Sequence, residues 1–359
     1  MNFQEEEDQF DRLPDALVRL IFNKVRDAKS LCRCKSVSKR FASIIPEIDT
    51  VFLTITRRNP IPINDDHVKE SADRNSKSSS HGLPPRNFLK SLINKLITKP
   101  LRFILHVISP KSSSSSRFSE DENELSYHSP NEVLKNFNEI QSLQIELPAH
   151  GGEIGSNGGD SLLKWKAEFG SELKSCLILG ATSFHRDNNG EQRLEQEHEQ
   201  FTDDDLKLRV VWTLSCLIAA SARHYFLQQV VSDHHEMLRS VVVTDASKQG
   251  RLCMREEQIE ELRSSSAKLE SSERSRVPAL KMKLWYVPVL ELPASGCVMK
   301  GATLVVIRPV DGPPATIKSD NDDLLRGAFD GEEEDKALGE AVREMMKKKN
   351  TYTLEMNSF

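Results

Sequence analysis

The chain has 359 residues, enough for two or three domains, yet only 38% of them are hydrophobic, below the roughly 45–50% of an average globular chain. A buried core must therefore coexist with long solvated segments. The formal net charge of −5 is close to balance for this length, so charge alone does not favour a protein that binds nucleic acid or acidic substrates.

The N-terminal residues lack the features of a secretory signal. MNFQEEEDQF is acidic and polar, whereas a signal has a basic flank and an apolar core. The longest nearly apolar run, residues 210–222, has 13 residues, whereas a membrane span needs about 20, so we expect a buried core helix there. The cysteines have no framework spacing, and we expect reduced thiols in a protein of the cytoplasm and/or the nucleus. They are Cys32, Cys34, Cys176, Cys216, Cys253 and Cys297.

The residue pattern over 10–50 predicts three short helices. Pro14 suits a first helical turn, where its missing amide donor costs nothing, and only three residues between Ala16 and Val25 are polar. The apolar residues of this first helix fall on nearly two sides, although a surface helix needs only one apolar stripe. Asp27 and Ser38 are the residues expected to cap the second and third helices.

This helical unit has more apolar surface than it can bury. A free-standing unit of about 40 residues buries too little surface to be stable alone. The surplus therefore implies a cover, because exposed apolar patches mark interaction sites. Either another protein or the chain's own C-terminal region can supply that cover, and the residues alone do not choose between them.

A family resemblance favours another protein as the cover of this apolar surface. Residues 10–50 resemble an F-box, the adaptor-binding motif of substrate receptors in SCF (cullin-RING) ubiquitin ligases, through an opening Leu-Pro and a closing Val-Ser-Lys-Arg-aromatic at the right separation. Phe41 stands where the family most often has Trp, and it keeps an aromatic ring. The resemblance implies a non-catalytic receptor that binds a Skp-type adaptor and, through it, a cullin, and that presents an unknown protein substrate. The implied adaptor-binding residues are Leu13, Pro14, Leu17, Ile21, Leu31, Val37, Ser38, Lys39 and Phe41.

Cys32 and Cys34 stand one residue apart in a basic patch, which raises two other functions. A structural zinc site needs four ligands, and no second CxC, CxxC or HxxxH pattern lies nearby. The basic side chains could hold phosphates, but no recognition-helix pattern or interleaved aromatic residues accompany them. We therefore expect thiols that fill gaps in a helical unit, with no metal, no cofactor and no nucleic acid.

Two segments after residue 56 are rich in Ser, Pro and charge. We expect a flexible linker over residues 57–86 and a flexible insertion over 109–131. Between them, residues 86–105 carry apolar side chains at helical spacing, and their only charges are basic. Such an amphipathic stretch either docks on the fold or contacts an anionic membrane or a partner groove. A membrane-surface or scaffolding protein is therefore the alternative function, although we expect no membrane contact.

Short β-rich phrases recur through the rest of the chain. They end at Ile55, Leu147, Ala181 and Ala246, and two more lie at 282–292 and 302–309. Helical patterns at 161–173 and from about Asp203 to Val231 alternate with them, and this alternation predicts a parallel sheet. The fold class we expect is α/β, with an irregular leucine-rich-repeat-like, substrate-binding domain over 87–310 and long disordered insertions. Sequence resemblance to plant F-box proteins with such C-terminal regions supports it. An ordinary α/β domain is the alternative, because the strand phrases are irregularly spaced. Residues 311–359 are expected to form a polar, partly disordered tail.

Two further motifs are weak. Asp233 to Glu236 contains two histidines between acids, but adjacent residues on one element point in different directions and cannot converge on one ion. The glycine pairs at 151–152 and 158–159 lack the ending of a phosphate-binding loop. We predict ordinary turn and loop roles for both.

Overall fold

The structure is a computed structural model that describes residues 10, 12–55, 130–148, 161–186, 202–233, 237–266, 279–310, 333–348 and 351–356. Several predicted features lie outside the described residues. These are the linker at 57–86, the basic amphipathic stretch, nearly all of the insertion at 109–131, the glycine pairs and the stretch His234 to Glu236.

The N-terminal helices are α1 (Asp15–Val25), α2 (Ala28–Lys35) and α3 (Lys39–Ile44), followed by the short 3-10 helix η1 (Ile45–Glu47). The predicted caps of α2 and α3 are both present. Asp27 accepts a hydrogen bond from the Ser30 amide at 2.8 Å, and Ser38 accepts one from the Phe41 amide at 3.1 Å. Each bond satisfies an amide that has no partner within the helix, which is why the chain turns helical at these two residues.

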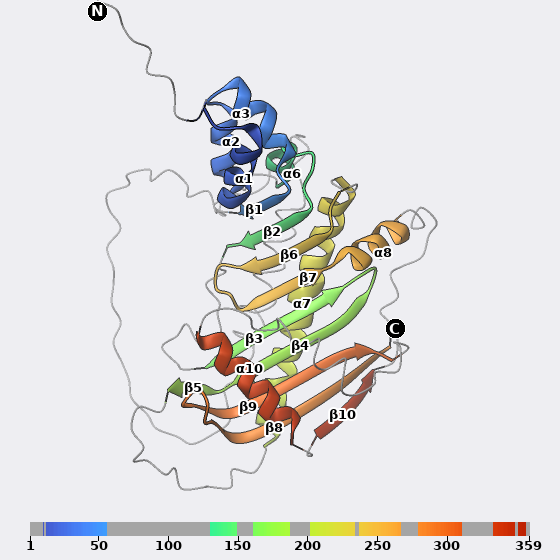
Figure 1. Ribbon diagram of the computed structural model, residues 1–359. Helices are drawn as coiled ribbons and strands as arrows, with labels where there is room; N and C mark the ends of the chain where they lie inside the picture. The colour runs from blue at the N-terminus through green and yellow to red at the C-terminus, as the bar shows by residue number, and fades with distance from the viewer. Residues whose placement is uncertain are drawn as a thin grey trace, which may run out of the picture.

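The strands of the described chain form one ten-stranded sheet (Figure 1) in the order β1-β2-β6-β7-β3-β4-β9-β8-β10, with β5 paired to β9. The α/β fold class with an N-terminal helical unit is thereby confirmed. The strands are β1 (Thr50–Thr54), β2 (Ser142–Leu147), β3 (Leu162–Phe169), β4 (Leu173–Ala181), β5 (Ser183–Arg186), β6 (Ser240–Asp245), β7 (Gly250–Met254), β8 (Leu280–Leu292), β9 (Cys297–Pro309) and β10 (Thr351–Met356).

The sheet is mixed, so the prediction of a parallel sheet is wrong for much of it. β1, β2 and β6 are parallel neighbours, and β3 is parallel to β7. The other pairs are antiparallel, and β8 and β9 form a long hairpin. Short connections allow antiparallel pairing where a parallel pair would need a crossover. The leucine-rich-repeat-like character of the region stays a prediction.

One predicted helix is a strand. Residues 161–173 were expected to be helical, but β3 occupies most of them because its apolar residues alternate with polar ones at period two. The buried side chains of this alternation are Leu163, Trp165, Ala167 and Phe169.

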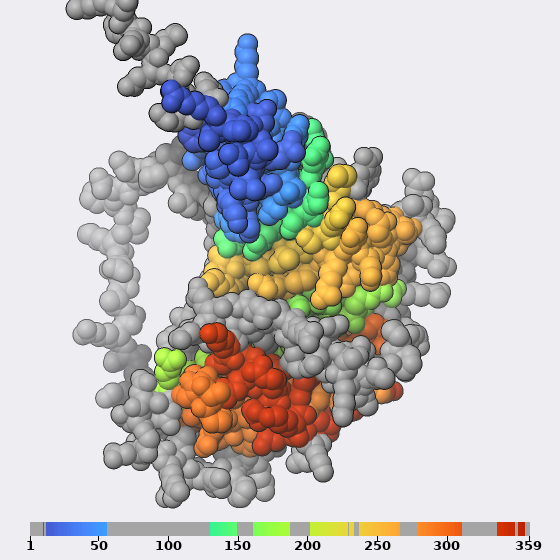
Figure 2. Space-filling view, in the orientation of Figure 1, coloured from blue at the N-terminus to red at the C-terminus, as the bar shows by residue number. Residues whose placement is uncertain are grey.

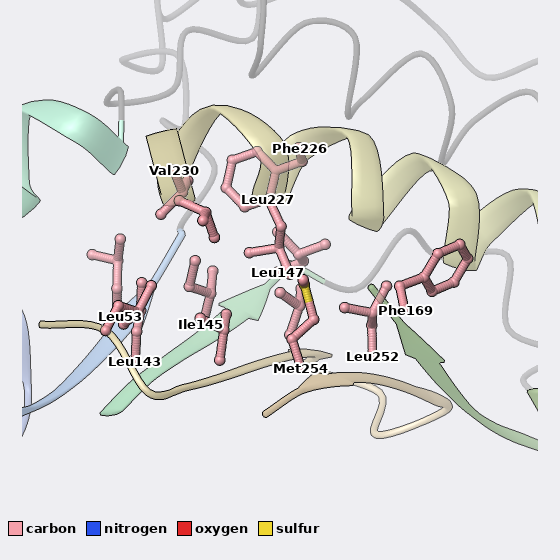
Figure 3. Close-up of a cluster of buried hydrophobic side chains, with 14 of the residues drawn as sticks. Leu53, Leu143, Ile145, Leu147, Phe169, Phe226, Leu227, Val230, Leu252 and Met254 are labelled. Atoms are coloured by element: carbon pink, nitrogen blue, oxygen red, sulfur yellow. The ribbon is translucent and has the colours of Figure 1, made fainter. Parts of the chain in front are cut away.

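The long helix α7 (Asp203–Asp233) lies across one face of the sheet and builds its main core, as the sequence predicts. Thr202 and Asp205 form the expected capping box, with the Asp205 amide 3.2 Å from the Thr202 hydroxyl. Figure 3 shows the side chains of α7 that meet the strands, among them Leu227 and Val230. By length and composition α7 is the one helix among the described residues that could cross a membrane, but 61% of its most apolar window is buried inside the fold.

The prediction of a polar, partly disordered tail over residues 311–359 is partly wrong. These residues contain α10 (Glu333–Met346), which packs on β8 and β9, and β10, which pairs with β8. Ala337, Leu338 and Val342 of α10 are fully buried in a second apolar cluster. The Glu340 carboxylate accepts hydrogen bonds from the amides of Ala294 and Ser295, in the turn between β8 and β9. This helix was not predicted from the sequence because its small and aliphatic residues stand within a highly charged stretch.

The helical unit is continuous with the sheet. β1 precedes the predicted linker at 57–86, so that segment does not separate the two parts. Ala28, Leu31 and Ile48 share one core with the strands, and α6 (Pro130–Leu134) contacts α2. Backbone hydrogen bonds run from Phe52 to Arg26 and from Asn138 to Pro46, each at 2.8 Å. The helical unit is therefore held rigidly at one edge of the sheet.

Candidate docking surface

The helix α1 has one buried face and one exposed apolar face. Val18 and Phe22 turn inward, with Val18 only 1% exposed, and pack on the core. Leu17, Leu20 and Ile21 point outward, and Leu20 is 60% exposed. Residues three and four apart lie on one side of a helix, so both faces follow directly from the two stripes in the sequence.

Further exposed apolar residues extend this surface. Pro14 is exposed before α1, Val25 is exposed at its end, and Val37 is 72% exposed just before α3. An ion pair between Arg40 and Asp15, at 2.8 Å, brings the start of α3 beside the start of α1. We call the exposed set the docking face: Pro14, Leu17, Leu20, Ile21, Val25 and Val37. Figure 2 shows the helical unit as a lobe at one end of the molecule.

Arg40 fixes the segment that leads into α1. Its guanidinium donates to the carbonyl of Phe10 at 2.7 Å and to that of Leu13, in addition to pairing with Asp15. This basic residue is therefore engaged within the unit. The arrangement sets the position of Pro14 at one end of the docking face.

The predicted adaptor-binding residues divide into two groups. Pro14, Leu17, Ile21, Val37, Ser38 and Lys39 are exposed and stand where a partner can contact them. The others support the unit from within or at its margin.

Leu31 is 0% exposed, so its side chain packs the core and cannot contact a partner. Leu13 is half-buried against the same core. Phe41 lies between Phe10 and Phe22, with ring centroids 5.8 and 5.1 Å away, in edge-to-face geometry. The prediction of direct contact is therefore wrong for Leu31, because the family motif mixes surface and core positions.

Two residues of the docking face were missed as site residues. Leu20 and Val25 belong to the apolar surplus of α1, and this surplus was already visible in the sequence. A helical projection of residues 15–25 places Leu20 on the outward side. It places Val25 beside the buried Val18, so the exposure of Val25 comes from its position at the end of α1 and could not be read from the projection. The family motif alone does not name them.

Ser38 acts through the helix it caps. We expect Ser38→Ala to lower the free energy of unfolding by about 1 kcal/mol, because the Phe41 amide loses its acceptor. Chemical denaturation measures the change. Ser43→Ala is the control, since the exposed Ser43 hydroxyl only donates to the Arg40 carbonyl and its loss should change stability by less than about 0.5 kcal/mol. Equal effects of the two substitutions would contradict the capping role.

The paired cysteines of α2 pack against the core of the helical unit. Cys32 and Cys34 are partly buried against the core, and burial raises the pKa of the Cys32 thiol. A protonated thiol is a poor metal ligand, because metals bind the thiolate. Throughout the ranges given above, no group of three or more His, Cys, Asp or Glu residues is placed to hold a metal ion.

The candidate site is thus an outward apolar face on a small helical unit that is fused to a mixed sheet. Comparison with known proteins gives its family. Residues 10–50 match the F-box-like family. The F-box protein At1g30200 of Arabidopsis thaliana is 44% identical over 98% of this chain and 94% of its own length. F-box proteins At4g18380 and At5g46170 of the same plant are 42% and 41% identical, over 99% and 98% of this chain and 95% and 94% of theirs. No solved structure matches the chain. The chain belongs to the plant F-box proteins.

Proposed function

We propose that this protein is a non-catalytic substrate-recognition subunit of an SCF ubiquitin ligase. The observation that carries the proposal is the docking face, a set of exposed apolar side chains on α1 and before α3 that no described part of the chain covers. The docking face binds a Skp-type adaptor and, through it, a cullin. Apolar anchors at the centre of an interface typically supply most of its binding energy.

The sheet supplies the second half of the function. Because the helical unit and the sheet share one core, a target bound to the sheet is held at a fixed orientation to the adaptor. Catalysis then rests on proximity, since a target lysine held beside a ubiquitin thioester on another subunit reacts at a high effective concentration. In this mechanism the chain contributes binding and orientation in the cytoplasm or nucleus, and another subunit carries out the chemistry.

Proximity labelling in plant cells tests this function. We expect the wild-type chain to label a Skp-type adaptor, a cullin and additional proteins that include its targets. Leu17→Asp/Ile21→Asp should lose the adaptor and cullin while keeping the targets, because charges on the docking face oppose an apolar interface. Point substitutions suit this test better than removal of residues 1–50, since removal would open the shared core.

The control is Val289→Asp, which also places a carboxylate at an exposed apolar position, on β8 at the far side of the sheet. It should retain the adaptor and the cullin. If the double variant keeps the adaptor, or if the wild-type chain never labels one, the proposed function is wrong.

A further inference from the structure

The outward side of α7 carries a row of apolar side chains. Leu206, Val210 and Leu214 follow one another at a spacing of four residues and are 45–47% exposed. The half-buried Ile218 continues the row, and the exposed Tyr225 lies further along the same side. A spacing of four keeps these side chains on one face of the helix. We call these five residues the α7 stripe.

The α7 stripe is almost free of charge. Lys207 is the only exposed charged residue between Leu206 and Tyr225, and it pairs with Asp204 at 2.8 Å. Arg209 and Arg223, the other cations of this length of helix, are buried on its sheet side. The acids Asp203 and Asp204 lie at the beginning of the row. A ligand of the stripe should therefore be apolar, with any charge it carries being positive.

The opposite side of α7 already packs on the sheet, through Trp212, Phe226 and Leu227 among others. A helix that is apolar on all sides is normally covered on all sides. An apolar row of this length on the surface therefore marks a contact.

The chain itself contains a segment with the matching pattern. Residues 87–105 place apolar side chains at helical spacing, and their charges are all basic. The apolar set is Phe88, Leu89, Leu92, Ile93, Leu96 and Ile97, and the basic set is Lys90, Lys95, Lys99 and Arg102. From Phe88 to Ile97 this row would extend about 14 Å as a helix, and the α7 stripe from Leu206 to Ile218 extends about 18 Å.

The chain returns close to α7 after this segment. The described residues resume at Pro130 with α6, and α6 contacts α7. Residues 106–129 can span roughly 80 Å when extended, whereas α7 is about 46 Å long. The segment can therefore reach every part of the α7 stripe without disturbing the fold.

We propose that residues 87–105 dock on the α7 stripe, with their apolar side against Leu206, Val210, Leu214 and Ile218 and their basic side facing solvent. Asp203 and Asp204 lie at the N-terminal end of the stripe, where they attract those basic side chains at the margin of the docked segment that lie nearest to them. The docked segment completes a second apolar layer outside α7, and it replaces the membrane or second chain that the stripe would otherwise attract. This inference does not depend on adaptor binding.

Photo-crosslinking of the full chain tests the proposal. The photoreactive residue p-benzoylphenylalanine at position 214 should crosslink to residues 87–105 of the same chain, identified by mass spectrometry of the digested monomer. The same probe at position 289, also at an exposed apolar site but on β8, should not reach that segment. In Leu92→Asp/Leu96→Asp the crosslink from position 214 should fall at least tenfold, while the tryptophan emission of the fold stays unchanged.

Every other result overturns the proposal. Crosslinks from position 214 that join two chains, shown with a mixture of isotopically light and heavy protein, would assign the stripe to a second copy. Crosslinks to lipid in vesicles of phosphatidylcholine and phosphatidylserine, with none to residues 87–105, would assign it to a membrane. A crosslink to residues 87–105 that persists in the double variant, or no crosslink at all, would show that the apolar side of the segment does not dock there.

Discussion

Asp245→Asn should lower the free energy of unfolding by about 3–5 kcal/mol, one of the largest effects expected of a single substitution in this protein. The Asp245 carboxylate at the end of β6 is 7% exposed and pairs with the buried guanidinium of Arg223 on α7. It also accepts hydrogen bonds from the amides of Gln249 and Gly250, which close the turn into β7. The guanidinium carbon of Arg223 in turn lies 4.5 Å from the centroid of the Trp165 ring. Removing the negative charge leaves a buried cation without compensation.

Chemical denaturation followed by tryptophan emission measures this loss. Arg223→Met/Asp245→Asn should recover much of it, because the double variant buries neither charge. Asp204→Asn is the matched control, since its ion pair with Lys207 is exposed and should contribute no more than about 1 kcal/mol. An Asp245→Asn protein as stable as the wild type would contradict the role of the pair.

The same pair gives a pH dependence. Burial alone would raise the pKa of the Asp245 carboxyl, but Arg223 and the hydrogen bonds from Ser247 and Gln249 outweigh burial and hold the pKa below its usual range. The stabilisation is therefore fully present above the unfolded pKa of about 3.9 and is lost as the pH falls below that value through the folded pKa. Acid titrations of stability should show a steeper loss for the wild type than for Asp245→Asn.

Leu31→Ala should lower the free energy of unfolding by about 2–5 kcal/mol and should destabilise the helical unit and the sheet together. Leu31 is fully buried in the core that α2 shares with the strands. The three tryptophans, Trp165, Trp212 and Trp285, all lie in the sheet or on α7. Their emission therefore reports on the sheet, although the substitution lies in the helical unit.

In denaturation of Leu31→Ala, circular dichroism and tryptophan emission should shift together to lower denaturant. The control Leu17→Ala removes an exposed side chain and should change stability by less than about 0.5 kcal/mol. If Leu31→Ala melted helical signal first and left the tryptophan transition unchanged, the helical unit would be an independent domain and the rigid connection would be wrong.

The sequence predicts the helical unit well because its signals are local. A proline before α1, two capping side chains and apolar periodicity define three helices without reference to the rest of the chain. The capping box of α7 is equally local. The apolar surplus of α1 also indicates a docking face, although the family motif does not separate the exposed Leu17 from the buried Leu31.

The arrangement of the sheet depends on contacts between distant residues. β3 was interpreted as a helix because apolar alternation at period two and apolar spacing at helical period look alike over a short stretch. Its pairing with β7 and β4 makes this segment a strand. α10 and β10 were assigned to a tail because their apolar residues are few. Only the packing of α10 on β8 and β9 and the pairing of β10 with β8 show that both belong to the fold. No local feature of the sequence indicates that β1 pairs with β2, because a long insertion separates the two strands in the chain.

The affinity of the purified full chain for a purified Skp-type adaptor tests the central claim, that the docking face binds the adaptor. Calorimetry should show binding by the wild type and at least a 100-fold weaker affinity for Leu17→Asp, a loss of about 2.7 kcal/mol. Val289→Asp, changed at a position 45% exposed against 48% for Leu17, should bind within about twofold of the wild type. An adaptor that binds Leu17→Asp as tightly as the wild type, or that binds neither, would contradict the account.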